Sequence, residues 1–116
     1  MHKVIIENAI FHAYHGVFEE ETIVGGKFEV NIEMETDFSE SAKTDELDGT
    51  IDYSAVYRLV EQEMKIPSKL IEHVGQRIVN ALYENFSNIH FIRLKISKLA
   101  PPIKATIEKV SVVIEE

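Results

Sequence analysis

The sequence contains no cysteine, and only three of its 116 residues are proline. Without cysteine the chain can form no disulfide and has no thiol nucleophile, and only histidines and carboxylates remain as metal ligands. This composition is compatible with a reducing compartment. At this length we expect one domain over residues 1–116, which can bury roughly two-thirds of its unfolded surface.

Positive charge is also scarce, because 12 basic side chains stand against 20 acidic ones and the formal net charge is -8. Such a surface repels phosphate backbones and anionic lipid headgroups. A long hydrophobic run is lacking near the N-terminus, where the apolar stretch after Lys3 is too short for a signal sequence or a membrane span. We therefore expect a cytoplasmic protein that binds neither nucleic acid nor membrane.

Four segments have the apolar patterns of strands. Residues 4–14 carry apolar side chains on both parities, which predicts a long strand covered on both faces. Residues 28–38 alternate strictly, which predicts one face on a core and one in water. Residues 91–98 and 107–114 are predicted to form the last two strands. Between the first two strands, residues 16–26 predict a loop of about ten residues, a length that is often functional.

A polar, turn-rich stretch over residues 39–49 leads into two predicted helices. Asp52 can cap the first helix, and Pro67 ends it. Ser68 can cap the second helix, which runs to about Asn85. The helices are neighbours because only a few residues join them.

The order strand, strand, helix, helix, strand, strand predicts an α+β fold. In this fold a four-stranded antiparallel sheet carries both helices on one face. An open sheet of this kind exposes two long edge strands to unwanted pairing. We therefore expect a homo-oligomer in which sheets join edge to edge into a closed barrel.

Two charged residues occupy positions that suit chemistry. Glu72 lies in the first turn of the second predicted helix, where the helix dipole favours a charged carboxylate that could bind the two adjacent N–H donors of a pterin or guanine edge. Acids are common in first turns, so a structural role is also compatible with this position. Lys98 ends an apolar strand face, where a partly desolvated ammonium would suit proton transfer. A lysine at a strand end more often only discourages edge pairing.

Position alone assigns no function to Tyr53 or Glu21. Tyr53 directly follows the predicted cap of the first helix, where a tyrosine is more often a packing residue. Glu21 lies in the predicted loop, where an acid is usually solvated.

The five histidines do not predict a metal site. His12 and His15 would point to opposite faces of one strand, and the other three belong to different elements. The chain also lacks the P-loop, dinucleotide-binding, zinc-protease and serine-hydrolase motifs. We therefore predict no metal and no cofactor.

Several short motifs follow one another along the chain. They are Tyr14-His15-Gly16, Glu21 four residues before Gly25, Thr44-Asp45-Glu46-Leu47, Thr50-Ile51-Asp52-Tyr53, Leu70-Ile71-Glu72-His73, and Lys95-Ile96-Ser97-Lys98 before Pro101-Pro102. In order and spacing they resemble the dihydroneopterin aldolase family, and the resemblance covers nearly the whole chain.

The resemblance implies the tunnelling fold, in which ββααββ units close edge to edge into a ring, commonly of four subunits, and two rings stack into an octamer. It implies active sites between subunits. It also implies an aldehyde-lyase of folate biosynthesis that splits 7,8-dihydroneopterin into 6-hydroxymethyl-7,8-dihydropterin and glycolaldehyde. Because the C=N bond of the ring can accept the electrons of the broken bond, neither a metal nor a lysine Schiff base is required.

The resemblance also implies a role for each candidate residue. Glu72 would hold the 2-amino and N3–H edge of the pterin, and main-chain groups near Ile71 would complete this contact. Lys98 would move protons at the side-chain hydroxyl and at the ring nitrogen. Tyr53 would help to protonate the enol intermediate, and Glu21 would bind the hydroxyls of the trihydroxypropyl tail.

Alternative functions remain open. An epimerase of dihydroneopterin or its triphosphate would use the same bond cleavage and its reversal, but a triphosphate needs a basic cluster, for which Lys95, Lys98 and Lys104 are the only local set. A zinc-dependent tetrahydropterin synthase would need three converging histidines. A non-catalytic pterin-binding oligomer would need Glu72 and the pocket, but neither Lys98 nor Tyr53.

Overall fold

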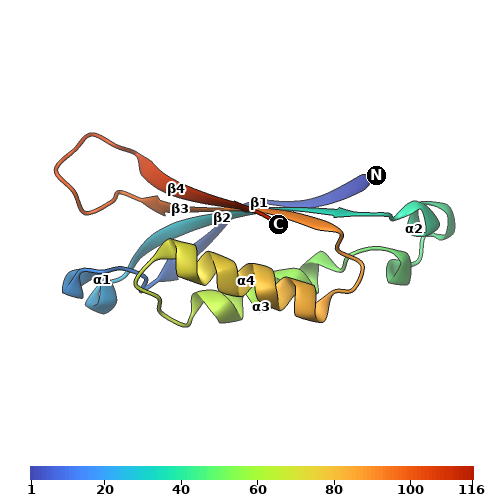
Figure 1. Cartoon of the computed structure of the whole chain (residues 1–116), viewed down its shortest axis with the longest axis horizontal. Helices are drawn as coiled ribbons and strands as arrows, with labels where there is room; N and C mark the ends of the chain where they lie inside the picture. Colours follow the sequence, from blue (N-terminus) through green and yellow to red (C-terminus); the bar gives the residue numbers. More distant parts are fainter.

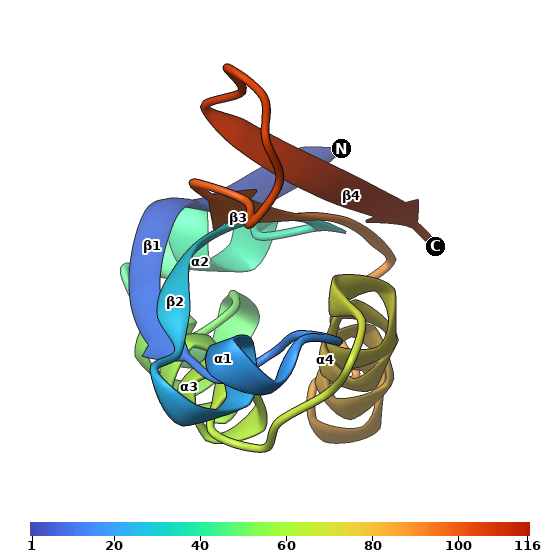
Figure 2. The same cartoon turned by 90° about the vertical axis from the view of Figure 1, so that its left-hand side faces the viewer.

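The computed structural model describes residues 1–116 and has four strands and four α-helices. The elements are, in chain order, β1 (His2–Ala13), α1 (Glu19–Ile23), β2 (Gly26–Thr36), α2 (Ser39–Thr44), the short 3-10 helix η1 (Leu47–Gly49), α3 (Tyr53–Met64), α4 (Ile71–Asn85), β3 (Phe91–Leu99) and β4 (Lys109–Glu115). The strands form one antiparallel sheet in the order β1-β2-β3-β4. Helices α3 and α4 lie side by side on one face of this sheet (Figure 1, Figure 2). The predicted α+β fold is thereby confirmed.

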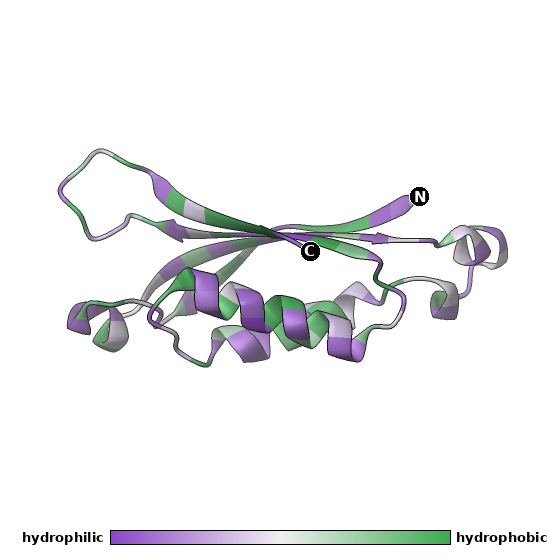
Figure 3. Ribbon diagram, in the orientation of Figure 1, coloured by the Kyte–Doolittle hydropathy of each residue, from purple (hydrophilic) through white to green (hydrophobic).

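The core fills the space between the sheet and the two long helices. The predicted alternation along β2 is confirmed, because every second residue from Phe28 to Thr36 is buried and the intervening residues are partly exposed. Each large apolar side chain buried in this way contributes about 1.5–3 kcal/mol. Other core residues are Ile92, Leu94 and Ile96 from β3, Val56, Val60 and Met64 from α3, and Val74, Ile78 and Leu82 from α4. Apolar segments of both helices face the sheet (Figure 3). No helix combines the length and the apolar character needed to cross a membrane.

The prediction that β1 is covered on both faces is wrong for this chain. The register with β2 shifts between Ile6 and Ala9, and Asn8 has a φ of 55° and donates its N–H to Asn31 Oδ1 at 2.7 Å. This β-bulge reverses the parity that faces the helices. The inward residues are therefore Val4 and Ile6 before the bulge and Ala9, Phe11 and Ala13 after it. The opposite face of β1 leaves Ile5 and Ile10 about half exposed, at 49% and 45%.

The predicted loop over residues 16–26 is partly wrong because it contains α1. The first turn of this helix consists of three acidic residues, whose charge is favourable beside its free N–H groups. The carboxylate of Glu21 accepts a hydrogen bond from the Phe18 N–H at 3.2 Å. Gly25, with a φ of 76°, follows the helix and allows the chain to turn into β2. The stretch over residues 39–49, predicted as turn-rich, contains α2 and η1.

The two long helices begin differently. At α3 the prediction is confirmed, because Asp52 Oδ1 accepts the N–H groups of Ser54 at 3.0 Å and Ala55 at 3.4 Å. At α4 the predicted cap Ser68 is wrong. The N-cap position is held by Leu70, whose side chain makes no capping hydrogen bond.

Ser68 is held away from the helix start by long-range contacts. Its N–H donates to His15 Nδ1 at 3.0 Å, its hydroxyl oxygen lies 2.7 Å from His73 Nδ1, and Arg77 donates to the same oxygen at 3.0 Å. Arg77 also donates to Glu63 Oε1 at 2.6 Å and so joins the end of α3 to α4. These contacts hold the segment that leads into α4 and leave the N-terminus of α4 open.

Candidate active site

A cavity lies at the end of the molecule where β3 ends and α4 begins. Its volume is about 270 Å³, and its lining includes Glu21, Ile71, Glu72 and Lys98. Apolar side chains complete the wall, among them Val17, Phe18, Pro102, Ile103, Val110 and Val112. Four of the five residues that the family resemblance implies therefore meet in one place, which we call the Glu72 cavity.

Lys98 and Glu21 form an ion pair in the wall of the Glu72 cavity. Lys98 Nζ donates to Glu21 Oε2 at 2.7 Å, and the side chains are only 20% and 14% exposed. Partial burial by itself would raise the pKa of Glu21, but the hydrogen bonds from Lys98 and from the backbone N–H of Phe18 outweigh it and lower this pKa below its ordinary value. The pair therefore presents a carboxylate acceptor beside an ammonium donor.

The sequence pattern around both partners explains why they meet. Lys98 continues the inward face of β3, pairs with Phe28 of β2, and has its Nζ 5.9 Å from the centre of the Phe28 ring. Gly16 lets the chain fold back, because a Cβ at this position would overlap the side chain of Glu21. The Gly16 N–H is also bound, to the Ser68 carbonyl oxygen at 3.0 Å.

The open N-terminus of α4 forms another part of the wall. Because no side chain caps this helix, the N–H groups of Ile71 and Glu72 have no acceptor within the chain. The Glu72 side chain lies beside them and is exposed. This wall therefore offers a carboxylate and unpaired backbone donors to a ligand.

Tyr53 does not meet the other candidates within one chain. It is the first residue of α3, is 65% exposed, and lines a separate hollow with Ile6, Tyr57 and Arg58. Helix α3 is about 18 Å long and places Tyr53 at the opposite end from the turn into α4 (Figure 1). A site that uses both Tyr53 and Lys98 needs a second chain.

His15 is a site residue for which the sequence predicts no role beyond its place in a motif. It is only 1% exposed, and its Nδ1 accepts the Ser68 N–H. Burial, followed by the positive charges of Arg77 and Lys98, lowers the pKa of His15 from 6.5 to about 4. The imidazole is therefore neutral near pH 7 and carries its proton on Nε2.

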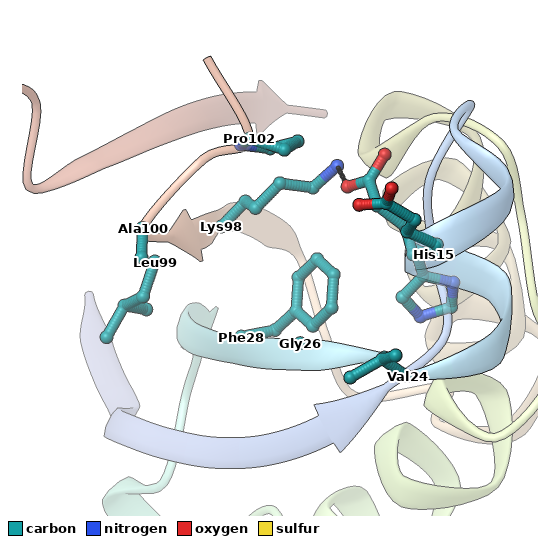
Figure 4. Close-up of a pocket in the computed structure, with 11 residues that line it drawn as sticks. His15, Val24, Gly26, Phe28, Lys98, Leu99, Ala100 and Pro102 are labelled. Carbon is teal, nitrogen blue, oxygen red and sulfur yellow. Dashed lines mark hydrogen bonds and ion pairs between the residues drawn. The ribbon is translucent and has the colours of Figure 1, made fainter. Parts of the chain in front are cut away.

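His15 lines a second cavity of about 220 Å³, which we call the His15 cavity. Its wall also includes Glu20, Glu21, Phe28 and Lys98, and Figure 4 shows Lys98 extending from β3 past Phe28 on the side facing His15. The Glu72 cavity and the His15 cavity have Glu21, Lys98 and Pro102 in common. The ion pair is thus a wall that both cavities share.

Across residues 1–116, no three histidine, aspartate or glutamate side chains come together as metal ligands would. The chemistry that the site offers is hydrogen bonding and proton transfer by Lys98, Glu21, Glu72 and His15.

The fold and these cavities define a small α+β protein with an ion-paired polar cavity at the end of an antiparallel sheet. A family model described as FolB, dihydroneopterin aldolase, matches residues 4–115. The dihydroneopterin aldolase of Bacillus subtilis (strain 168) is 36% identical over 116 residues, which cover 97% of this chain and 94% of that protein. The enzyme of Streptococcus pyogenes serotype M1 is 34% identical over 119 residues, with 99% and 98% covered.

A solved structure agrees with the sequence relatives. The chain matches E. coli dihydroneopterin aldolase in complex with neopterin with a TM-score of 0.91 and 27% identity, over 100% of this chain and 99% of that chain. The chain therefore belongs to the dihydroneopterin aldolase family. It is accordingly an enzyme, an aldehyde-lyase of folate biosynthesis.

Proposed function

We propose that the protein cleaves 7,8-dihydroneopterin by a retro-aldol reaction into 6-hydroxymethyl-7,8-dihydropterin and glycolaldehyde. The observation that carries this proposal is the Lys98–Glu21 ion pair, which lies in one cavity with Glu72 and the open N-terminus of α4. This arrangement combines an anchor for a flat ring with a proton-transfer group. Membership of the family supports the same reaction.

In the proposed complex, Glu72 and the α4 N-terminus bind the pterin ring. The Glu72 carboxylate accepts hydrogen bonds from the 2-amino group and N3–H, and main-chain groups near Ile71 complete the contact. The E. coli relative is described in complex with neopterin, which favours a pterin ligand here. Glu21 binds hydroxyls of the substrate's tail.

In the proposed reaction, a proton leaves the tail hydroxyl next to the bond that breaks, and the ring C=N bond accepts the electron pair of that bond. A proton is added to the ring nitrogen and glycolaldehyde departs. The resulting enol takes up a proton on carbon while the ring nitrogen gives its proton back, which restores the C=N bond and forms the hydroxymethyl product. Lys98 moves the protons at the hydroxyl and ring nitrogen, and Tyr53 helps to protonate the enol. The ring itself acts as the electron sink, so the proposed mechanism uses neither a metal nor a Schiff base.

The complete site is proposed to form between subunits. Residues 1–116 would act as one tunnelling-fold domain, and such domains would join β1 to β4 into a ring of commonly four, with two rings in an octamer. In support of this, β1 and β4 are the open edges of the sheet, and apolar Ile5, Ile10 and Val113 are exposed on them. A neighbouring subunit would then supply Tyr53. A cytoplasmic location is part of the same proposal.

The competing epimerase of a pterin triphosphate gains no support from the side-chain placement. Lys95 lies on the sheet face opposite to Lys98, because strand residues alternate and Ile96 is in the core. Lys104 lies in the connection between β3 and β4, and of these three lysines only Lys98 lines the Glu72 cavity or the His15 cavity. A role in binding alone would give the partly buried Lys98–Glu21 pair no function.

The deciding experiment is incubation of the purified protein with 7,8-dihydroneopterin in EDTA, with glycolaldehyde and the hydroxymethyl product measured separately. We expect equal amounts of both. A control reaction with the triphosphate, monitored for epimer formation, tests the alternative function. If the wild-type protein releases no glycolaldehyde, the aldolase proposal is wrong.

A further inference from the structure

Ser68 is a buried polar residue, 8% exposed, that joins two parts of the chain. Its hydroxyl oxygen accepts a hydrogen bond from Arg77 Nη2 at 3.0 Å and lies 2.7 Å from His73 Nδ1, to which the hydroxyl can donate its proton. Its main-chain N–H donates to His15 Nδ1 at 3.0 Å, and its carbonyl oxygen accepts the Gly16 N–H at 3.0 Å. The side chain of Ser68 is therefore bound to α4, and its main chain is bound to the segment that follows β1.

The contacts on α4 lie directly behind the proposed anchor of the ring. His73 follows Glu72 in the first turn of the helix, and Arg77 lies on the same helix face as His73 because four residues separate them. The Glu72 side chain is itself exposed, so its position follows from the position of the helix that carries it. The hydroxyl of Ser68 therefore holds the helix end on which the anchor stands.

The contacts on the segment after β1 lie directly behind the ion pair. Gly16 packs against Glu21, because a Cβ at Gly16 would come within 2.5 Å of atoms of the Glu21 side chain. The His15 ring packs edge to face with Phe28, their centres 5.2 Å apart, and Lys98 Nζ lies 5.9 Å from the centre of the same Phe28 ring (Figure 4). This segment therefore supports both members of the ion pair from behind.

We propose that Ser68 is a positioning residue for the reaction, whose hydroxyl fixes the place of Glu72 relative to the ion pair. This inference rests on the proposed function, which assigns the ring to Glu72 and proton transfer to Lys98. Ser68 lines neither the Glu72 cavity nor the His15 cavity, so its effect on the substrate reaches the site through α4. A displacement of about 1 Å between an anchored substrate and its proton-transfer group can lower a rate about 100-fold. Ser68 thus keeps the ring and the proton-transfer group aligned.

Ser68→Ala tests this role, and Thr36→Val is the matched control. Ser68→Ala removes the hydroxyl contacts to α4 and leaves both main-chain contacts in place. Thr36 is only 1% exposed, and its hydroxyl donates to the Asn88 carbonyl oxygen at 2.6 Å, so Thr36→Val also removes one buried hydroxyl. Thr36 is the last residue of β2, whereas the His15 cavity lies at the strand end that begins with Gly26. The control therefore loses a comparable hydrogen bond far from the site.

We expect Ser68→Ala to lower kcat for 7,8-dihydroneopterin by about 10–100-fold per folded molecule, because the ring and Lys98 lose their alignment. KM and the affinity for pterin should change by less than about threefold, since the Glu72 carboxylate is still present. Thr36→Val should keep the wild-type kcat. Pterin titration gives the concentration of folded protein in each sample. A wild-type kcat in Ser68→Ala, an equal fall in both variants, or a loss of pterin affinity as large as the loss of kcat would overturn the inference.

A second variant covers the case in which Ser68→Ala does not fold. His73→Ala changes an exposed position of α4 and removes the other side of one hydroxyl contact. Its kcat should fall by about tenfold with pterin binding kept, and adding it to Ser68→Ala should lower kcat no further, because both remove the same hydrogen bond. A wild-type kcat in His73→Ala would refute the role of this contact. If the wild-type protein releases no glycolaldehyde, the proposed function fails and this inference with it; if it is active and both variants match its kcat, only the positioning role is wrong.

Discussion

Helices α3 and α4 are neighbours on the same sheet, but their N-termini are built in opposite ways. Asp52 caps α3 and accepts two of its backbone N–H groups, whereas no side chain caps α4. The open end of α4 lines the Glu72 cavity, and the segment before it is held by Ser68 and its partners His15 and Arg77. The open end of α4 thus keeps its donors free, as the proposed ligand requires, and takes its stability from contacts elsewhere in the chain.

The largest effect should come from Lys98→Ala, at the ion pair facing the open end of α4. Proton transfer by a positioned side chain contributes roughly 10²–10⁴-fold to a rate, and we expect turnover of dihydroneopterin to fall by about this factor. Pterin binding should persist, because the proposed anchor of the ring is Glu72.

Lys104→Ala, which removes an exposed lysine from the connection between β3 and β4, is the matched control and should turn over normally. Steady-state rates and pterin titrations measure both effects. Normal turnover by Lys98→Ala would remove Lys98 from the mechanism.

Glu72→Ala tests the open helix end directly. Loss of two hydrogen bonds to a carboxylate should weaken pterin binding about 100-fold or more, and thermal stability should change little because this carboxylate makes no hydrogen bond within the chain. Glu84→Ala, at an exposed position near the other end of α4, is the control for binding. Unchanged pterin affinity in Glu72→Ala, measured by calorimetry, would contradict the proposed anchor.

The Ser68–His15 hydrogen bond, which holds the segment before the open N-terminus of α4, should depend on pH. The unfolded chain protonates this histidine near pH 6.5 and the folded chain near pH 4, so between these values the unfolded state binds more protons. The contribution of His15 to the free energy of unfolding is therefore fully present above pH 6.5. It should fall by up to about 3 kcal/mol as the pH drops to 4. A protonated Nδ1 can no longer accept the Ser68 N–H.

Urea denaturation at pH 7 and pH 4.5 measures this loss, with His15→Asn as the comparison. The pH-dependent difference between wild type and variant should match the His15 contribution. An identical pH profile for both proteins would show that another group causes the loss.

Substitution at the capped N-terminus of α3 should have the smallest effect, and it should change stability but not turnover. Asp52→Ala removes the acceptor for Ser54 and Ala55 and should lower the free energy of unfolding by about 1 kcal/mol. Asp48→Ala, an exposed acid that caps no helix, is the control and should change stability by less than this. Turnover per folded molecule should remain normal in both variants. A stability loss in Glu72→Ala as large as that in Asp52→Ala would remove the contrast between the two helix ends.

Short-range sequence patterns predicted much of the fold. The alternation from Phe28 to Thr36 and the cap at Asp52 were predicted correctly because each depends on residues close together in the chain. The cap at Ser68 was wrong because its hydrogen-bonding groups are taken by His15 and Arg77, which no local pattern indicates. The α1 helix was missed because a five-residue helix has too few positions for a period, although its acidic first turn was a usable signal.

The candidate site was also predicted only in part from the sequence. The resemblance in sequence named Glu21, Ile71, Glu72 and Lys98, and the structure brings these four to one cavity. It leaves Tyr53 apart, where position alone had suggested nothing. Their roles stay predictions until the substitutions are measured.

Sequence alone determined the order of the four strands and the two long helices, the buried face of β2, the negative charge and the family motifs, because these follow from short-range periodicity and composition. Only the tertiary structure decided that Asn8 bulges β1 toward Asn31, that Glu21 pairs with Lys98 across 77 positions, and that Ser68 takes one nitrogen of His15. These outcomes depend on partners far away in the chain. The open end of α4 results from them, since its would-be cap is held by contacts that exist only after folding.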